Sequence, residues 1–413
     1  MSQMFELAKQ QYAALGIDVE KAMKIAAETP ISLHCWQGDD VLGFEGADSL
    51  TGGIQTTGNY PGRARNIDEL RKDIEVVLGM VPGTSKISLH ANYLDSSKHV
   101  ERNELEPCHF ASWADWALEK GVGLDFNSTS FSHPYGEKGS VTNPDEGLRQ
   151  YWIDHVKCCR RIAAYFGERL GQTCVTNHWF HDGEKEIPID AMGPRLRMRD
   201  SLDKAFAEPI DLKLTRDAVE SKLFGIGSEA YVPGSHEFYM GYAATRPNIL
   251  LTMDAGHFHP TEVISSKISA VLCFLDKILL HVSRPVRWDS DHVVLFDDET
   301  RQIMREVVRA DALDRAYLAL DYFDASINRI IAWTVGARNA RKALLSALLE
   351  PTETLKKLEA EGDNSSRLAL QQELLTLPFG AIWDEFCERQ NVPVGVKWLE
   401  MAKQYEKDVL SKR

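Results

Sequence analysis

Eight short apolar segments recur along the chain, and stretches with the apolar spacing of amphipathic helices separate them. This β-then-α repeat predicts a parallel sheet, because parallel neighbours need a long crossover that is usually a helix. Eight is also the number of strands that closes a (β/α)8 barrel, or TIM barrel, of the α/β class. We predict strands at residues 31–35, 86–89, 123–126, 173–176, 218–221, 249–253, 278–282 and 317–320.

Polar residues follow nearly every one of these segments. They are His34, His90, Asp125, 177–179, 220–222, 254–257, His281 and Asp321. In a barrel all eight carboxyl ends meet at one mouth, whereas an open doubly wound sheet, the alternative, concentrates its site at one switch point. The distribution of the polar residues therefore favours the barrel.

Several helix boundaries can be predicted from capping residues. Asn66 has a glutamate three residues later, which is typical of a capped start. Pro144 predicts the first turn of a helix that ends at Gly171. Pro260 predicts the start of another helix, which runs towards Leu275.

No strand is predicted after about residue 335, and the remaining chain has only helical spacing. We therefore expect two parts. Residues 1–335 form the catalytic barrel domain with its N-terminal helices, and residues 336–413 form a C-terminal helical extension. The extension is expected to pack on the barrel or to lie at a subunit interface.

Composition excludes several classes of protein. The formal net charge of −14 over 413 residues argues against nucleic acid or an anionic membrane as the main partner. The seven cysteines are scattered and have no paired spacing, which disfavours a disulfide framework or a structural zinc site. No apolar run approaches the ~20 residues that span a bilayer. A cytoplasmic location is expected.

Carboxylates and imidazoles cluster after the later strands. These residues are Glu220, Asp254, His257, His281, Asp289, Asp291 and Asp321. Hard divalent ions such as Mn²⁺ and Mg²⁺ prefer carboxylate oxygens, and Mn²⁺ also accepts imidazole. Any one of these residues alone is more often a helix cap or part of a turn. As a group they are too many for one catalytic ion, and they predict a site for two.

Other polar and aromatic residues are expected at the same mouth. His90 is predicted to act in acid–base chemistry or to bind a substrate hydroxyl; a packed core histidine is the alternative. Trp36 and Trp179 would floor a pocket, or belong to the core. Lys222 lies two residues after Glu220, so both would face one side of an extended strand, where the ammonium would polarise a substrate oxygen.

A glycine-rich loop at residues 51–62 follows the first strand. It matches neither a P-loop nor a dinucleotide fingerprint. A mobile surface loop is the default interpretation, and a substrate lid is the alternative.

Long blocks of the sequence closely resemble bacterial L-rhamnose isomerase, almost from end to end. They include His34-Cys35-Trp36-Gln37-Gly38-Asp39-Asp40 and the segments 52–55, 58–62, 219–227, 254–265, 281–294 and 321–329. The resemblance implies a homotetrameric TIM-barrel enzyme of rhamnose catabolism that interconverts L-rhamnose and L-rhamnulose. It also implies two Mn²⁺ ions per subunit, with Mg²⁺, Co²⁺ or Zn²⁺ as possible substitutes.

The resemblance assigns roles to the clustered residues. Glu220, Asp254, His281 and Asp321 would hold one ion, which grips the sugar. His257, Asp289 and Asp291 would hold the second, catalytic ion, with Glu220 bridging. The sequence departs from its relatives at residues 177–183, around Trp179, where the relatives are more apolar.

The chemistry implied is an aldose–ketose isomerisation, in which we expect a hydride to shift from C2 to C1 of the sugar. Lys222, His90 and Asp291 are the predicted catalytic residues, and Trp179, His90 and Lys222 the predicted sugar-binding residues. An enediol route with a carboxylate base is the alternative mechanism. Competing functions are a metal-dependent epimerase, an endonuclease, which the acidic charge disfavours, and a binding protein that kept the barrel without catalysis.

Overall fold

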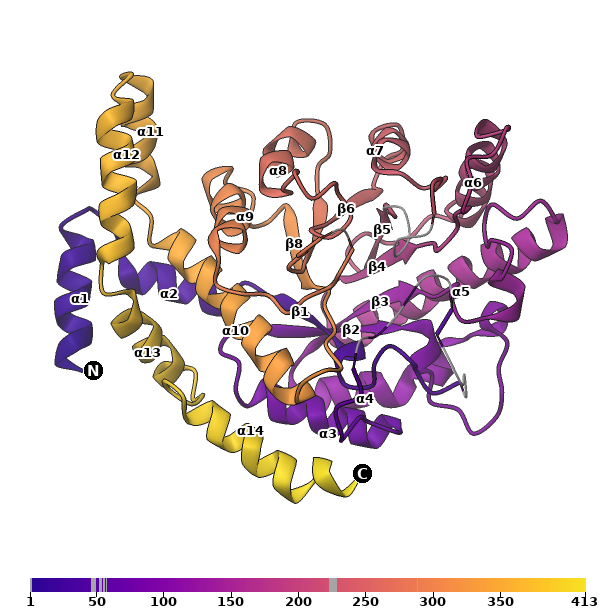
Figure 1. Ribbon diagram of the computed structural model, residues 1–413, viewed down its shortest axis with the longest axis horizontal. Helices are drawn as coiled ribbons and strands as arrows, with labels where there is room; N and C mark the ends of the chain where they lie inside the picture. The colour runs from indigo at the N-terminus through magenta and orange to yellow at the C-terminus, as the bar shows by residue number, and fades with distance from the viewer. Residues whose placement is uncertain are drawn as a thin grey trace.

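Eight parallel strands close into one barrel, in the order of the chain (Figure 1). The structure, a computed structural model, describes residues 2–45, 50, 51, 54, 56, 58–222, 229–287 and 289–413. The strands are β1 (Ile31–His34), β2 (Ser85–His90), β3 (Gly123–Ser128), β4 (Cys174–Trp179), β5 (Thr215–Glu220), β6 (Leu250–Asp254), β7 (Ile278–Val282) and β8 (Ala316–Leu320). β1 pairs with both β2 and β8, so the predicted barrel is confirmed and the open sheet is excluded.

The eight predicted strands are all present, and their bounds differ by up to three residues. β3 and β4 continue through polar residues at which the prediction ended them, as far as Ser128 and Trp179. Their register shows why, since Asn127 pairs with both His90 and Asn177. Polar side chains at the mouth of a barrel belong to the strands, so polarity alone marks the end of a strand too early.

Helices surround the barrel and extend it at both ends of the chain. α1 (Gln3–Ala13) and α2 (Val19–Glu28) precede β1. The helices between and after the strands are α3 (Ile67–Leu78), α4 (Ala111–Lys120), α5 (Glu146–Leu170), α6 (Met192–Ala205), α7 (His236–Ala244), α8 (Ser265–Leu272), α9 (Asp298–Arg309) and α10 (Arg329–Leu348). The last four are α11 (Thr352–Ala360), α12 (Asn364–Glu373), α13 (Phe379–Arg389) and α14 (Lys397–Asp408). Short 3-10 helices are η1 (Cys35–Gln37), η2 (Ala91–Tyr93), η3 (Arg102–Glu104), η4 (Pro107–Phe110), η5 (Pro134–Gly136), η6 (Leu374–Thr376) and η7 (Leu410–Lys412).

Two of the three predicted helix starts are wrong. Asn66 caps α3 as expected, because its side chain accepts a hydrogen bond from the third helical residue. α5, however, is capped by Asp145, so Pro144 lies outside the helix. The turn after Pro260 does not continue as a helix, and α8 begins only at Ser265. A proline is compatible with a first helical turn, but at α5 the side chain that accepts a free backbone N–H, that of Asp145, decides the position; α8 begins without such a cap.

The C-terminal helices run back along one side of the barrel. In Figure 1, α11 and α12 form a projecting hairpin, and α13 and α14 then lead down to the C-terminus near α3. α13 packs on the N-terminal helices through a separate apolar cluster that includes Phe5, Tyr12, Ile382, Trp383 and Phe386. The expected boundary at residue 335 falls inside α10, and the division into a barrel domain and an extension remains a prediction.

The interior of the barrel is packed below its mouth. An apolar layer inside it is formed by Val175, Ala218, Leu250, Leu279 and Ala319. Bulky side chains that fill the lumen are what makes such a barrel a solid core and not a pore. Chemistry is therefore confined to the carboxyl ends of the strands.

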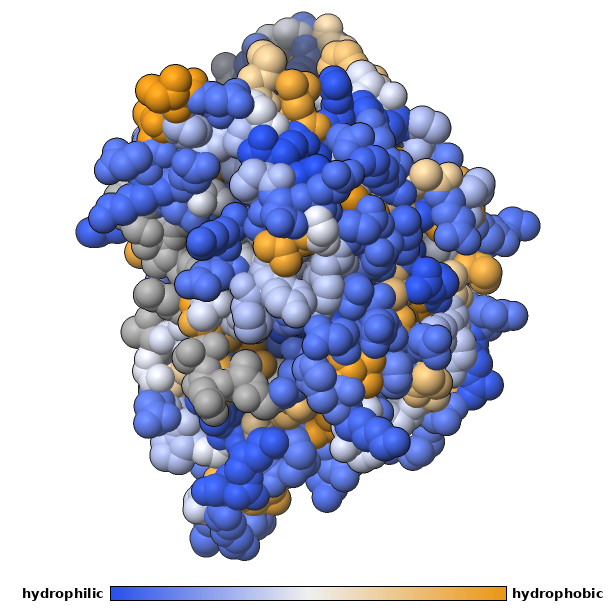
Figure 2. Space-filling view, turned by 90° about the vertical axis from the view of Figure 1, so that its right-hand side faces the viewer, coloured by the Kyte–Doolittle hydropathy of each residue, from blue (hydrophilic) through white to orange (hydrophobic). Residues whose placement is uncertain are grey.

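The outer surface is mostly polar on the face that Figure 2 shows, with hydrophobic residues in small, scattered groups. Among the described residues, no helix is both long and apolar enough to cross a membrane.

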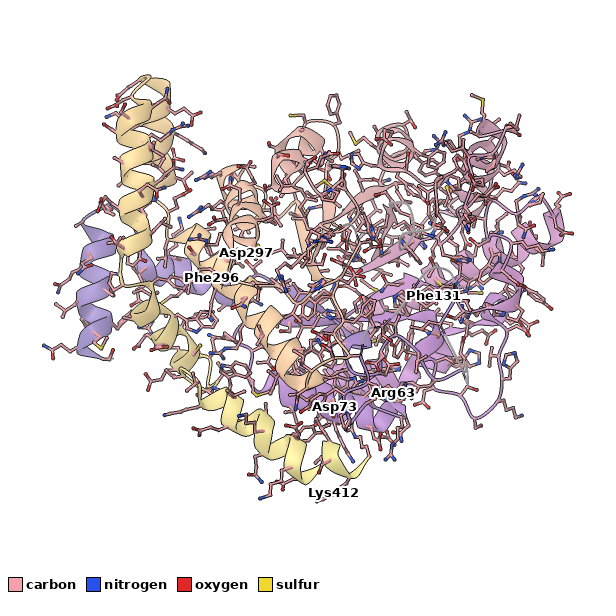
Figure 3. The ribbon with its side chains drawn as sticks, viewed as in Figure 1. Arg63, Asp73, Phe131, Phe296, Asp297 and Lys412 are labelled. Atoms are coloured by element: carbon pink, nitrogen blue, oxygen red, sulfur yellow. The ribbon has the colours of Figure 1, made fainter. Side chains whose placement is uncertain are left out.

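The C-terminus is clamped to α3 by a buried carboxylate. Asp73 accepts hydrogen bonds from Nη1 and Nη2 of Arg413, both at 2.7 Å, and from the Tyr405 hydroxyl at 2.7 Å. Figure 3 shows Asp73 on the side of the barrel along which the C-terminal end runs, near Lys412. This clamp connects the last residue of the chain to a barrel helix.

We expect Asp73→Asn to lower the free energy of unfolding by about 1–3 kcal/mol, because the buried Arg413 guanidinium would lose its nearer counter-charge and keep only Glu69. Urea unfolding followed by circular dichroism would measure the change. The matched control is Asp68→Asn on the same helix, whose side chain is 86% exposed; a surface change of this kind should stay within about 0.5 kcal/mol. Equal unfolding curves for both variants would contradict the clamp.

Candidate active site

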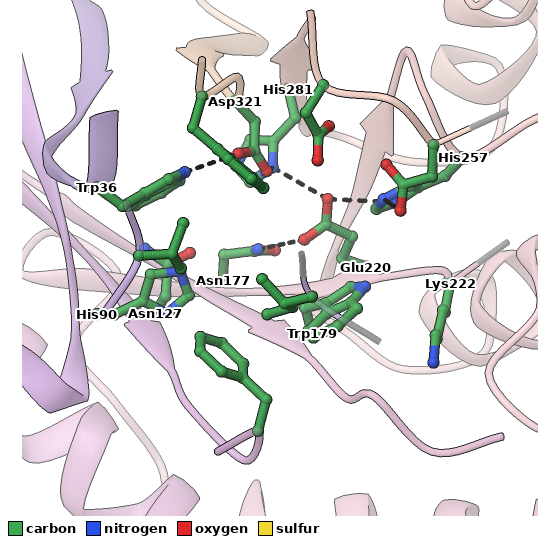
Figure 4. A pocket seen from close by; sticks show the side chains of 16 residues that line it. Trp36, His90, Asn127, Asn177, Trp179, Glu220, Lys222, His257, His281 and Asp321 are labelled. Carbon is green, nitrogen blue, oxygen red and sulfur yellow. Dashed lines mark hydrogen bonds and ion pairs between the residues drawn. The ribbon is translucent and has the colours of Figure 1, made fainter. Parts of the chain in front are cut away.

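A pocket opens at the carboxyl ends of the strands (Figure 4). All eight carboxyl ends contribute to this mouth through the strands or the loops that follow them. The lining residues are Trp36, Val41, Ile54, His90, Asn127, Phe131, Asn177, Trp179, Glu220, Lys222, His257, His281, Asp289, Asp291, Asp321 and Phe323. The barrel thus brings together residues separated by up to 287 positions in the chain.

Four of the predicted ligands form one compact group. Glu220, Asp254, His281 and Asp321 each offer one atom, and these four atoms all lie within 4.8 Å of one another. Nδ1 of His281 lies 3.0 Å from Oε1 of Glu220 and 3.3 Å from Oδ2 of Asp321. Glu220 and Asp254 are the last residues of β5 and β6, His281 is the last but one of β7, and Asp321 follows β8.

The other three predicted ligands lie in the loops after β6 and β7 and also line the pocket. His257 follows β6, and its Nδ1 lies 3.6 Å from Oε1 of Glu220 while its Nε2 lies 3.2 Å from Oδ2 of Asp289. Asp291, in the loop after β7, has a left-handed backbone with φ of 39°. Its carbonyl oxygen accepts a hydrogen bond from the backbone of Phe323, which ties this loop to the loop after β8. In Figure 4, Glu220 lies between His281 and His257.

The crowded carboxylates change the protonation of the site. Burial acts to lower the pKa of His257, but the charges of Asp254 and Asp289 outweigh it and hold that pKa well above its usual range. Burial likewise acts to lower the pKa of His281, and Glu220 and Asp321 reverse the effect. Burial, followed by the charge of Asp289, raises the pKa of Asp291 well above normal. All three shifts indicate a strongly negative potential in the pocket.

Three buried polar atoms of this cluster have no hydrogen-bond partner within the described chain. They are Oδ2 of Asp254, Nδ1 of His257 and Oδ1 of Asp289. The other oxygen of Asp254 accepts from the backbone N–H of Gly256 at 2.6 Å. Unsatisfied buried polar atoms are costly and call for an explanation, such as an ion that the protein binds there.

Lys222, whose ammonium group was predicted to polarise a substrate oxygen, lines the pocket, but this group already contacts other protein groups. Nζ of Lys222 donates to the carbonyl oxygen of His181 at 2.6 Å and lies 2.8 Å from a carboxylate oxygen of Glu229. It lies 5.8 Å from the centre of the Trp179 ring. Glu229, which orients Lys222, was not expected from the sequence, since the strand pattern ends before it.

Comparison with known proteins decides the family. The family model for L-rhamnose isomerase matches residues 1–413. The chain belongs to this family. An L-rhamnose isomerase from Salmonella paratyphi B and another from Salmonella heidelberg are each 55% identical over 415 residues, which cover 100% of this chain and 99% of each relative. This member of the L-rhamnose isomerase family is therefore an enzyme of the aldose–ketose isomerase class.

Solved structures of sugar epimerases are similar over much of the barrel. An L-ribulose 3-epimerase is 11% identical with a TM-score of 0.48, and it covers 79% of this chain and 97% of its own. A D-allulose 3-epimerase from Methylomonas sp. is 11% identical with a TM-score of 0.44, and the match covers 76% of this chain and 96% of the epimerase chain. Likeness of this size adds nothing to the barrel topology described above.

His90 is buried against aromatic rings at the mouth. Its Nδ1 lies 3.0 Å from the hydroxyl of Thr129, and its ring centre lies 4.6 Å from that of Trp36 and 5.4 Å from that of Phe131. Burial lowers the pKa of His90 to about 3. It therefore reaches the pocket as a neutral imidazole.

Several contacts that shape the site were not predicted from the sequence, although Trp36 and Asn177 were themselves expected at the mouth. Nε1 of Trp36 donates to Oδ1 of Asp321 at 3.0 Å, and Asn177 donates to Glu220. Phe131, which carried no signal in the sequence, adds an apolar wall from the loop after β3. The two hydrogen bonds join segments far apart in the chain.

His259 and His292 flank the candidate ligands in the sequence, but both are exposed and neither lines the pocket. Ile54 of the glycine-rich loop lines the pocket. Gly52, Gly53, Gln55 and Thr57 of that loop lie outside the described residues, so the lid remains a prediction.

We expect His90 to stay neutral between about pH 5 and pH 8, a range in which an unperturbed histidine changes charge. Nitrogen NMR of ¹⁵N-labelled histidine would check this, with His90→Gln to assign the resonance. The urea-unfolded protein is the control, since the same ring should then titrate near about 6.5. A midpoint near that value in the folded protein would contradict the burial argument.

Proposed function

We propose that this enzyme interconverts L-rhamnose and L-rhamnulose in rhamnose catabolism and that it does so with two divalent ions. The observation that carries the proposal is the convergence of Glu220, Asp254, His281 and Asp321 on one point of the pocket, in a chain of this family. His257, Asp289 and Asp291 would hold the second ion, with Glu220 shared. The competing idea of a binding protein without catalysis has no support in this arrangement.

The residues present fit such ions. Ligand atoms on opposite sides of an ion with bonds of about 2.0–2.6 Å lie about 4–5 Å apart, and the four atoms of the first group lie within 4.8 Å of one another. Two of the atoms without hydrogen-bond partners, on His257 and Asp289, belong to the second group. Bound cations would also relieve the negative potential that raises the pKa of the two histidines.

The donor set favours Mn²⁺. It consists of carboxylate oxygens and imidazole nitrogens, and no thiolate lies among the described lining residues. Mn²⁺ accepts both kinds of ligand, while Mg²⁺, Co²⁺ and Zn²⁺ remain possible substitutes because such sites discriminate weakly between divalent ions. When bound, the two ions would polarise the oxygens on C1 and C2 of the sugar.

The chain's own residues would orient the sugar. Trp179 and Phe131 provide aromatic walls, their ring centres 6.1 Å apart. His90, neutral and buried beside them, would hydrogen-bond the ring oxygen and assist ring opening. Lys222, oriented by Glu229 and His181, would stabilise negative charge on O1.

The proposed reaction is a hydride shift. A hydride leaves C2 and joins C1, and a proton leaves O2 and arrives on O1, so that the aldose becomes the ketose without an external oxidant. Asp291, at the edge of the pocket with its strained backbone, is our candidate for the carboxylate that helps to move this proton. The burial of the pocket supports this route, because it limits exchange with solvent.

We also propose a homotetramer in the cytoplasm. No residue of α12 is fully buried, and α12 packs on α11 in a hairpin that projects from the barrel. This supports a role for the extension, residues 336–413, in contacts between subunits. All seven cysteines are free, and five are buried, which suits a reducing compartment.

Chelator-treated protein is expected to lose L-rhamnose isomerase activity and to regain it with added Mn²⁺. The measurement is ketose formation from L-rhamnose, with L-mannose and L-lyxose as comparison sugars. A matched series with Mg²⁺, Co²⁺ and Zn²⁺ would rank the substitutes. Activity that survives complete removal of metal would overturn the two-ion proposal.

In heavy water, a hydride shift is expected to leave C1 of the ketose with little solvent deuterium, because the hydrogen never reaches the solvent. Proton NMR of L-rhamnulose formed from unlabelled L-rhamnose would measure the incorporation. The control is a base-catalysed isomerisation of the same sugar, which passes through an enediol. Extensive deuterium at C1 of the enzymatic product would favour the enediol route.

A further inference from the structure

Glu220 is held from the side by a chain of two hydrogen bonds that crosses three strands. Nδ2 of Asn177, on β4, donates to Oε2 of Glu220 at 2.5 Å. Oδ1 of Asn177 accepts from the hydroxyl of Thr252, on β6, at 2.7 Å. Asn177 is 4% exposed and Thr252 is fully buried, so both bonds are shielded from water.

The chemistry of the carboxylate, the amide and the hydroxyl fixes which group donates in each of the two hydrogen bonds. An ionised carboxylate can only accept hydrogen bonds, so the amide nitrogen of Asn177 must face Glu220. The amide oxygen then faces Thr252, and the threonine hydroxyl must donate. Without that hydroxyl, the buried amide oxygen would lose its donor, and Asn177 would be held through its bond to Glu220 alone.

The two oxygens of Glu220 consequently have different surroundings. Oε2 is occupied by Asn177, whereas Oε1 lies 3.0 Å from Nδ1 of His281 and 3.6 Å from Nδ1 of His257. These histidines belong to the two different groups of ligands described above. In Figure 4, Oε1 points between them while Oε2 points towards Asn177.

We propose that Asn177, oriented by Thr252, is a positioning residue that fixes the orientation of the Glu220 carboxylate between the two groups of ion ligands. This inference rests on the proposed two-ion function and deepens it. A carboxylate free to rotate could turn towards one group of ligands and away from the other. The hydrogen bond from Asn177 opposes this rotation, so that Glu220 would serve both ion sites.

The alternative is that these two hydrogen bonds only satisfy buried polar groups in the barrel wall and do not position Glu220. In that case, breaking them would lower the stability of the metal-free protein but would leave the relation between the two ions unchanged. The two interpretations therefore differ in metal affinity and in the magnetic coupling between bound Mn²⁺ ions. Neither quantity depends on turnover.

Thr252→Val tests the proposal, since it removes the hydroxyl at nearly constant volume; Thr252→Ser keeps the hydroxyl and serves as the rescue. Asn177→Leu removes the amide itself. The matched control is Thr176→Val, because Thr176 is a buried barrel threonine whose hydroxyl lies 3.2 Å from that of Thr215. Each full-length protein would be stripped of metal and titrated with Mn²⁺ alone, by calorimetry and by electron paramagnetic resonance.

The wild-type protein, Thr252→Ser and Thr176→Val are expected to bind two ions and to show an exchange-coupled spectrum. Thr252→Val and Asn177→Leu are expected to bind at least one ion about 10–100-fold more weakly, as is typical when a partner of a metal ligand is lost. Their coupled spectrum should be lost or reduced. The melting temperature of each metal-free protein shows that it is folded, and Thr252→Val alone suffices if Asn177→Leu does not fold.

Three outcomes would overturn the inference alone: coupled pairs with wild-type affinity in both Thr252→Val and Asn177→Leu, the same loss in Thr252→Ser as in Thr252→Val, or two uncoupled ions in the wild-type protein. A wild-type protein that binds fewer than two ions would overturn the inference together with the two-ion function. The assay of wild-type ketose formation separates these cases.

Discussion

Closure of the barrel between its first and last strands is the constraint on which the site depends. β1 has only four residues, and it pairs with β8 through Ile31 and Ser32. Side chains reinforce this contact between β1 and β8, the seam of the barrel, at its mouth. The Gln37 side chain exchanges two hydrogen bonds with the backbone of Asp324, at 3.0 and 2.8 Å, and Arg329 forms a bidentate ion pair with Asp40, both bonds at 2.7 Å. Buried bidentate pairs of this kind add geometric precision as well as energy.

The seam also reaches the candidate metal ligands. Trp36 follows β1 directly, and its indole N–H donates to Asp321, which follows β8. β8 pairs with β7, so Asp321 lies beside His281, and closure with β1 adds the Trp36 donor to this group. The ends of β5 to β8 thus form one cluster, whose mutual repulsion is compatible with a stable barrel only if the charges are compensated.

The negative charge of this pocket would be compensated by two kinds of group, protein hydrogen-bond donors and the proposed cations. Protein donors hold the outer oxygens: Trp36 on Asp321, Asn177 on Glu220 and the backbone of Gly256 on Asp254. The inner atoms, including Oδ2 of Asp254, are left without partners in the described chain. This division is what a cation site requires, because donors on the outer side orient each ligand while the inner side stays open to the ion.

Much of the fold could be predicted from the sequence because its signals are local. Strand segments are apolar runs, and the spacing between them is that of helices, so the number of strands and the barrel were predictable. Helix starts at Pro144 and Pro260 were predicted wrongly. At α5 the capping side chain of Asp145 outweighs the preference of proline for a first turn, whereas α8 begins at Ser265 without a side-chain cap. Strand ends at Asn127 and Asn177 were misjudged because both asparagines hydrogen-bond across the barrel wall.

The sequence by itself determined which residue types end each strand, and hence the seven carboxylates and imidazoles of the candidate site and the family to which the chain belongs. Only the tertiary structure decided how these side chains are oriented. Asp321 takes its hydrogen bond from a residue 285 positions away, and Glu220 takes one from a residue 43 positions away. Lys222 is engaged by His181, 41 positions earlier. Such contacts depend on distances across the closed barrel, and no local pattern of the sequence encodes a distance between strands.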